Sequence, residues 1–236
     1  MEHTYKKLDL ELSELRTKLS QMGDLVIDQM QRALACLNEH DVRGTHVIIE
    51  GDINLNRMDI DLEETCLQFM ALHQPVARDL RFIAAVMKIT TELERIGDRV
   101  VDLCGAVHSR DDRDSVDSHT EISRMGALAI AMVQDSMTAF SQADESLAKA
   151  VFHKDKEFDA LYSGVFGRLM SSAKEAENAA HDTGLAFLSK DLNEISEHAT
   201  NIAEVVMFMI DGKEITHMDM HERREGGATV RPERLQ

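Results

Sequence analysis

The sequence predicts an all-α protein built from two tandem three-helix bundles. Apolar residues recur every three or four positions over long stretches, which is the period of a helix with one buried face. The 236 residues include only 2 Pro and no run of alternating apolar and polar residues that would indicate a strand. The chain also contains an internal duplication, so whatever fold the first half adopts is expected again in the second.

The duplication can be followed residue by residue. Met22-Gly23 returns as Met125-Gly126 and Asp52 returns as Asp155, so corresponding positions are 103 residues apart (22 to 125 and 52 to 155). Further along, segment 93–98 aligns with segment 192–197, now 99 positions apart (93 to 192). This repeat is far longer than the periods of about 20–50 residues that mark solenoid arrays. It indicates a duplicated unit of domain size.

The periodic stretches predict three helices in each copy. In the first copy they cover about 8–37, 45–72 and 79–108, with a stop at Pro75, which lacks an amide N–H. In the second copy they cover about 121–141, 146–178 and 183–210. The predicted organisation is a first bundle at 1–109, an acidic linker at 110–120, a second bundle at 121–212 and a polar tail at 213–236 that we expect to be flexible.

Composition limits the function. The formal net charge of −17 disfavours nucleic acid as a ligand, because phosphate backbones need a basic surface. The N-terminus has no signal-peptide core and no stretch is apolar enough for a membrane span, so we expect a cytoplasmic protein. Cys36, Cys66 and Cys104 lie at wide spacings in apolar stretches, which predicts buried free thiols.

Acidic residues form rows on two predicted helices of each copy. Glu94, Asp98 and Asp102 are four residues apart, so they share one helix face, opposite a face of apolar residues that should be buried. The preceding helix carries a similar row. The candidate metal ligands in the two copies are Asp52, Asp59, Glu94, Asp98 and Asp102, and then Asp155, Asp159 and Glu197.

Such rows are usually solvated helix faces. Two observations favour a metal site instead. Like charges at i, i+4 destabilise a helix by about 0.2–0.5 kcal/mol per pair, whereas a merely solubilising face would alternate Glu with Lys. The rows also recur on corresponding helices of both copies, and oxygen ligands suit hard or borderline cations. In the second copy Asn193 and Asn201 stand at the places of Glu94 and Asp102, which predicts a weaker site there.

Several segments together resemble the PhoU family of phosphate-signalling regulators. They are Gln74-Pro75 with Asp79-Leu80-Arg81, the run Glu92-Leu93-Glu94-Arg95-Ile96-Gly97-Asp98, Glu50-Gly51-Asp52, and His198-Ala199-Thr200-Asn201. The resemblance implies two three-helix bundles side by side. It also implies multinuclear iron or zinc clusters held by carboxylates. The residues of this sequence that match the family's metal-binding motif are Asp52, Glu94, Asp98, Asp155 and Asp159.

The same resemblance implies a function. It implies a homodimeric adaptor that negatively regulates the phosphate-starvation response and phosphate uptake. The expected partners are the ATPase subunit of a phosphate ABC transporter and a membrane sensor histidine kinase.

Two other functions stay open. A metal-dependent phosphohydrolase could use the same carboxylates, but it would need a concave pocket with an open coordination position. The sequence shows no nucleophile with an evident base and no phosphate-binding loop, so we expect no enzyme activity and assign no catalytic residue. A helical scaffold without metal is the third possibility, and metal analysis separates it from the first.

Overall fold

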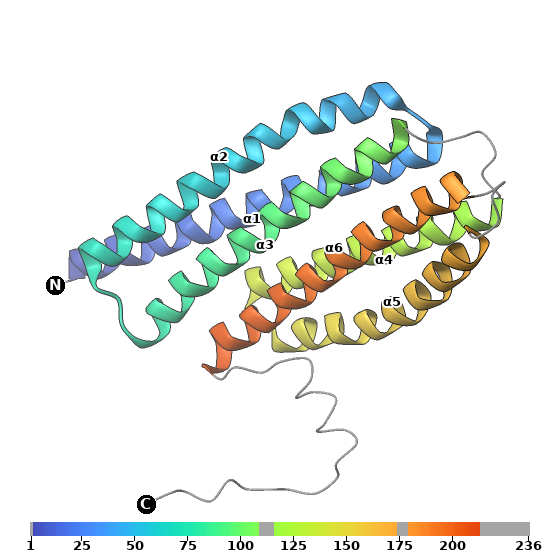
Figure 1. Cartoon of the computed structure of the whole chain (residues 1–236). Helices are drawn as coiled ribbons and strands as arrows, with labels where there is room; N and C mark the ends of the chain where they lie inside the picture. The colour runs from blue at the N-terminus through green and yellow to red at the C-terminus, as the bar shows by residue number, and fades with distance from the viewer. Residues whose placement is uncertain (1, 109–115, 174–178, 213–236) are drawn as a thin grey trace, which may run out of the picture.

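The computed structural model describes residues 2–108, 116–173 and 179–212, which form six long helices (Figure 1). In chain order they are α1 (Glu2–Glu39), α2 (Val42–His73), α3 (Ala77–His108), α4 (Val116–Gln142), α5 (Glu145–Ser172) and α6 (Ala179–Asp211). No strand occurs within these ranges. The predicted all-α class is confirmed, and each repeat supplies three helices.

The helix ends differ from the prediction mainly around the connections of the second repeat. α4 begins at Val116, inside the predicted linker 110–120. α5 ends at Ser172, although its apolar period predicted helix up to 178. Residues 109–115, 174–178 and the predicted tail 213–236 lie outside the described ranges.

Both repeats start their second helix in the same way. His40 and Ala143, at corresponding positions, have left-handed backbone angles with φ of 57° and 52°. The next residue in each repeat is an aspartate whose side chain accepts backbone N–H groups of the first helical turn, Asp41 for α2 and Asp144 for α5. The duplication is therefore preserved in local structure as well as in sequence.

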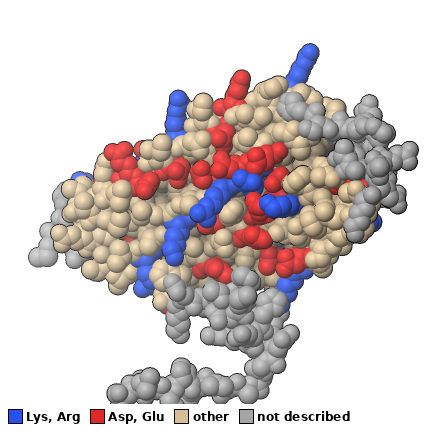
Figure 2. Space-filling model, in the orientation of Figure 1, with Lys and Arg blue, Asp and Glu red and all other residues tan. Residues whose placement is uncertain are grey.

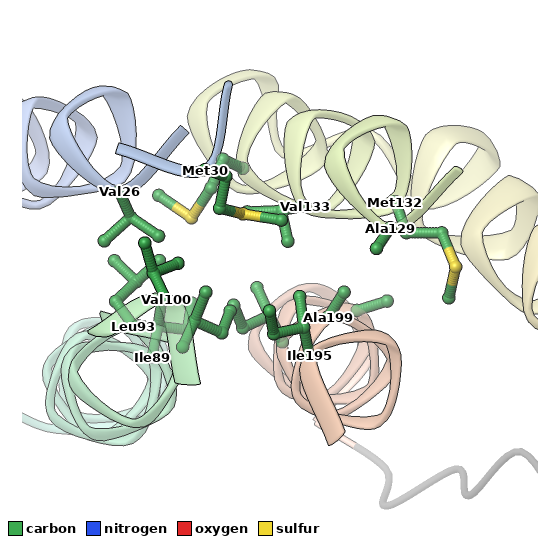
Figure 3. Packing of buried hydrophobic residues seen from close by; sticks show 14 of the residues in the cluster. Val26, Met30, Ile89, Leu93, Val100, Ala129, Met132, Val133, Ile195 and Ala199 are labelled. Carbon is green, nitrogen blue, oxygen red and sulfur yellow. The ribbon is translucent and has the colours of Figure 1, made fainter. Parts of the chain in front are cut away.

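Four helices, α1, α3, α4 and α6, form the centre of the molecule, while α2 and α5 lie along its two outer edges (Figure 1). Figure 3 shows side chains from all four central helices turned toward the same space, among them Val26, Met30, Leu93, Val133 and Ile195. The two bundles therefore share one continuous hydrophobic core. The α3 face predicted to be buried is confirmed, since these residues are at most 8% exposed: Ile89, Leu93, Ile96, Val100, Leu103 and Val107.

Two glycines bring the central helices α1 and α4 close together. A Cβ added at Gly23 of α1 would lie 2.7 Å from Cε of Met137, and one added at Gly126 of α4 would lie 2.7 Å from Cδ1 of Leu34. Gly23 corresponds to Gly126 in the repeat, and Leu34 corresponds to Met137. The same contact is therefore made twice, once in each direction, so an internal two-fold axis relates the repeats.

The two-fold relation makes α3 and α6 antiparallel neighbours (Figure 1). Their acidic outer sides consequently lie on one face of the molecule. None of the helices in the described ranges is long and apolar enough to cross a membrane.

Candidate metal centre

α2 packs tightly against α3 at Gly97. A Cβ at this position would lie only 2.1 Å from Cδ2 of buried Leu55 and 3.4 Å from Oδ1 of Asp52. The missing side chain lets α2 settle against α3, and it places Asp52 directly beside the α3 residue that precedes Asp98. The helices that carry the two acidic rows of the first repeat are therefore neighbours.

Four carboxylates of the first repeat form an acidic cluster, which we define as Asp52, Asp59, Glu94 and Asp98. Partial burial raises the pKa of Glu94, and repulsion from the other three members raises it further, against the weaker effect of Arg95. Burial and the charge of Asp98 likewise raise the pKa of Asp52. Asp98 of α3 and Asp52 and Asp59 of α2 are therefore all close enough for their charges to act on Glu94.

The partners of the other cluster members in the described part of the chain are mostly neutral or acidic. Asp52 accepts a hydrogen bond from the Asn56 amide at 3.0 Å, and burial together with nearby Glu63 raises the pKa of Asp59. Within the described ranges no member of the cluster forms an ion pair with Lys, Arg or His. Partly buried carboxylates with raised pKa values are in an environment that a bound cation would stabilise.

The donor set fits a cation, but the side chains are not closed around one. Carboxylate oxygens are the ligands that hard cations prefer, and four of them lie on two adjacent helices here. In the part of the chain that the structure describes, no group of three or more His, Cys, Asp or Glu side chains is arranged so that it could hold a metal ion as it stands. Binding would therefore require rotation of these partly exposed side chains toward a common point.

Asp102, the fifth carboxylate predicted for the first site, has other partners. It forms an ion pair with Arg99 at 2.8 Å, and its charge acts on Asp191 of α6. Its side chain is half exposed. The structure therefore places Asp102 at the junction between the repeats, one helical turn beyond the acidic cluster.

The second repeat arranges its predicted ligands differently. Asp155 accepts a hydrogen bond from the Thr200 hydroxyl at 3.2 Å, and Glu197 accepts one from the Asn193 amide at 2.7 Å. Asp159 is exposed on α5. Asp155 and Glu197 thus each accept a neutral hydrogen bond, as Asp52 does from Asn56 in the first repeat.

A polar junction between the repeats was not anticipated from the sequence. We use this term for Glu92, Arg99, Asp191 and His198, which join α3 to α6. Nδ1 of His198 lies 2.7 Å from the Glu92 carboxylate, and the Arg99 guanidinium lies 3.8 Å from the Asp191 carboxylate. Figure 2 shows acidic and basic side chains gathered along the middle of this face, where α3 and α6 run in Figure 1.

The polar junction obeys the internal repeat. Glu92 and Asp191 are corresponding residues, 99 positions apart, and so are Arg99 and His198. The two cross-repeat pairs are therefore the same contact seen from each side of the two-fold axis. Asn201 also belongs here, because its amide donates to Glu92 at 3.0 Å. The acidic and basic residues that correspond at an offset of 99 positions can be read from the sequence. Only the antiparallel packing of α3 and α6 brings an acidic residue of one helix next to a basic residue of the other.

Fold and site together define a class of protein: a duplicated helical bundle with surface carboxylates, in which two repeats related by an internal two-fold axis share one hydrophobic core. The PhoU domain model matches the chain twice, at residues 19–107 and 122–206. The chain belongs to the PhoU family.

Relatives of known name and structure agree with this membership. The chain is 32% identical over 219 residues to a phosphate-specific transport system accessory protein PhoU homolog from Caulobacter vibrioides, covering 91% of this chain and 94% of the relative. It is 28% identical to the accessory protein PhoU of Escherichia coli, over 92% and 90% of the two chains. The crystal structure of the phosphate transport system regulatory protein PhoU from Streptococcus pneumoniae superposes with a TM-score of 0.82 at 27% identity, covering 88% of this chain and 99% of that one.

Proposed function

We propose that this protein is a negative regulator of phosphate uptake and of the phosphate-starvation response, and that it acts as a cytoplasmic adaptor. The observation that carries this proposal is the match of both repeats to the PhoU domain, together with relatives of nearly equal length that are named as accessory proteins of phosphate-specific transport. Those names support a role in the regulation of phosphate transport. Its partners would be the ATPase subunit of a phosphate ABC transporter and a sensor histidine kinase.

The shape of the site favours an adaptor over an enzyme. The acidic cluster lies on the outer side of two adjacent helices, and its residues are partly or fully exposed. A cavity between the repeats, lined by Met30, Leu34, Leu103, Ile130 and other apolar groups, has a volume of about 10 Å³. That volume holds about one water molecule, so this cavity cannot admit a phosphate ester. A phosphohydrolase would need a polar pocket beside the carboxylates.

Metal binding forms the second part of the proposal. Asp52, Asp59, Glu94 and Asp98 would hold iron or zinc in the first repeat, with Asp155, Asp159 and Glu197 as a weaker set in the second. A bound cation would neutralise the carboxylates and link α2 to α3. The support for this part is the mutual repulsion within the acidic cluster and the oxygen-rich donor set.

The thiols support the cytoplasmic location. Cys36, Cys66 and Cys104 are all buried, as predicted, and burial raises the pKa of Cys66 to about 11 and that of Cys104 to about 12. Protonated, enclosed thiols of this kind are structural and unreactive, and they suit a reducing compartment.

A gene deletion tests the regulatory proposal. A strain without this protein, carrying a phosphate-starvation reporter and checked for a second copy of the gene, should express the reporter even when phosphate is plentiful. Restoring the wild-type gene should return repression. A reporter that still shuts off normally in the deletion strain would refute the proposal. Phosphatase assays with added Fe, Zn and Mn would detect the alternative enzyme activity.

A further inference from the structure

The second repeat has a tyrosine in its row of candidate ligands. Asp155, Asp159 and Tyr162 follow one another at spacings of four and three residues on α5, so they share one helix face. Tyr162 lies 103 positions after Asp59 (59 to 162), so it stands where the first repeat has a carboxylate of the acidic cluster. The two repeats therefore differ in the chemistry of this position.

This face of α5 is turned toward α6, its neighbour in Figure 1. The Thr200 hydroxyl of α6 donates a hydrogen bond to Asp155 at 3.2 Å, which fixes where the two helices meet. The helices run antiparallel, so Tyr162, about two turns further along α5, faces the part of α6 about two turns before Thr200. Asn193 lies there, and its amide donates to Glu197 at 2.7 Å. Tyr162 is therefore placed beside the candidate ligand that α6 supplies.

The charges that act on Tyr162 agree with this placement. Burial raises the pKa of Tyr162, the ammonium group of Lys190 lowers it, and the carboxylates of Glu197 and Glu194 raise it. These three groups of α6 are therefore close enough for their charges to act on the phenol. The ring of Tyr162 packs against Phe166, with the ring centres 5.4 Å apart. Among the described residues, the Tyr162 hydroxyl forms no hydrogen bond, so its oxygen is available to a ligand.

Three carboxylates and a phenol are a donor set that suits ferric iron. All four groups offer oxygen, the ligand that hard cations prefer, and tyrosine is also the protein ligand of the haem iron in catalase. A phenol must lose its proton to bind a metal, and trivalent iron displaces that proton more readily than divalent zinc because of its higher charge. In the described part of the chain the carboxylates are not closed around an ion, so binding would require rotation of side chains such as exposed Asp159.

We propose that Tyr162 is an iron ligand of the second repeat, where it joins Asp155, Asp159 and Glu197 and gives this set a preference for ferric iron over zinc. The inference rests on the metal-binding part of the proposed function and adds a ligand that the first repeat lacks. The second repeat stays the weaker of the two sets, because it has three carboxylates against four and the phenol proton must be displaced.

A phenolate bound to ferric iron has a spectroscopic signature of its own. It absorbs visible light by charge transfer from the ring to the metal, and resonance Raman spectra excited in that band show tyrosine ring vibrations. Carboxylate ligands have no ring and cannot give these vibrations. The signature therefore reports on Tyr162 itself rather than on iron binding in general.

Ferric iron binding to the full chain is the first test. The metal-free protein is mixed with ferric citrate, desalted, and studied by elemental analysis, visible absorption and resonance Raman spectroscopy. The wild type should show the charge-transfer band with tyrosine ring vibrations, and Tyr162→Phe should lose both. In a Glu94→Gln, Asp98→Asn background, which isolates the second repeat, Tyr162→Phe should weaken ferric binding by at least about tenfold, since even outer-shell partners contribute that much. Circular dichroism checks that each variant is folded.

Three controls isolate the role of Tyr162. The chain has one other tyrosine, Tyr5, so Tyr5→Phe should leave the band unchanged. The Glu94→Gln, Asp98→Asn protein should keep the band, because its second repeat is intact. Zinc content should be the same in the wild type and in Tyr162→Phe, because divalent zinc displaces the phenol proton poorly.

The outcomes separate this inference from the metal-binding proposal on which it rests. Ferric iron that binds without tyrosine ring vibrations, or a band that Tyr162→Phe retains, would overturn the role of Tyr162 and leave metal binding intact. Equal losses of iron and zinc in Tyr162→Phe would show that the side chain only supports the packing of α5 on α6. A wild type that binds no iron at all would refute both proposals.

Discussion

Glu92 on α3 and His198 on α6 lie 2.7 Å apart across the boundary between the repeats, and Asn201 adds a hydrogen bond to the same carboxylate at 3.0 Å. Burial alone would raise the pKa of Glu92, but these two partners hold it below its ordinary value. The corresponding carboxylate of the second repeat, Asp191, is less well matched. Burial and repulsion from Asp102 raise its pKa to about 6, although Arg99 is nearby. Glu92 and Asp191 therefore occupy corresponding positions of the polar junction, but the pKa of Glu92 is lowered and that of Asp191 is raised.

The first prediction contrasts these two carboxylates at neutral pH. Glu92→Ala should lower the free energy of unfolding by about 1–3 kcal/mol, because it leaves His198 and Asn201 without their partly buried acceptor. Asp191→Ala should leave the free energy unchanged or raise it, because it removes a carboxylate whose charged form is disfavoured by burial. Urea denaturation followed by circular dichroism measures both. Equal losses for the two variants would contradict the assigned difference between the pairs.

The second prediction concerns metal content. Glu94→Gln combined with Asp98→Asn should remove most of the iron or zinc that the purified protein binds, because these groups contribute half of the charge of the acidic cluster. In the absence of metal the same variant should be at least as stable as wild type, since repulsion within the cluster is relieved. Elemental analysis and thermal denaturation with and without a chelator provide the readouts.

The matched control for the metal lies in the second repeat. Asp155→Asn with Glu197→Gln should reduce the metal content much less, because that set has fewer charged ligands and each of these two residues already accepts a neutral hydrogen bond. If both double variants lose the same amount of metal, the proposed asymmetry is wrong. If neither loses any, the acidic cluster is a solvated surface.

The third prediction tests the close approach of α2 and α3. Gly97→Ala should destabilise the protein by about 1–3 kcal/mol, since the new Cβ would lie 2.1 Å from the Leu55 side chain in the core. Gly105→Ala on the same helix has nothing within 4 Å and should stabilise it by about 0.5–1 kcal/mol. Chemical denaturation of the two variants gives the comparison. A neutral Gly97→Ala substitution would show that Leu55 can move aside without cost.

The fourth prediction is a pH dependence at the start of α5. Asp144 accepts hydrogen bonds from the Ser146 hydroxyl and from the amides of Ser146 and Leu147, and these lower its pKa below 3.8. A lowered folded-state pKa stabilises the protein above the unfolded-state value, and this contribution is lost as the pH falls through the folded-state pKa. Asp144→Ala should therefore lower Tm at neutral pH.

The difference in Tm between Asp144→Ala and wild type should shrink as the solution becomes more acidic than pH 3.8. Asp41→Ala is the control in the first repeat. The Asp41 side chain accepts one hydrogen bond, from the amide of Arg43, so its loss should lower Tm less. A constant Tm difference between Asp144→Ala and wild type across the acidic range would mean that the Asp144 charge is not the stabilising feature.

The acidic sites were only partly accessible from sequence. The spacing of Glu94 and Asp98 placed them on the outer face of α3, and the parallel row on α2 predicted the neighbours that the structure places beside them. Asp102 could not be assigned in the same way. Its helical spacing continues the row, and its ion-pair partner Arg99 lies one turn away on the same helix, but only the packing of α6 on α3 brings its charge close to Asp191.

The sequence by itself determined the secondary structure and the duplication, because apolar period, proline positions and repeat offset are local or linear properties of the chain. It also determined which side of α3 is buried. Only the tertiary structure decided that the two bundles share one core, since Gly23 against Met137 and Gly126 against Leu34 act across more than 90 residues. The same packing turns Glu92 and His198 into partners. Contacts between distant segments depend on how whole helices pack, and no pattern within a single helix specifies that packing.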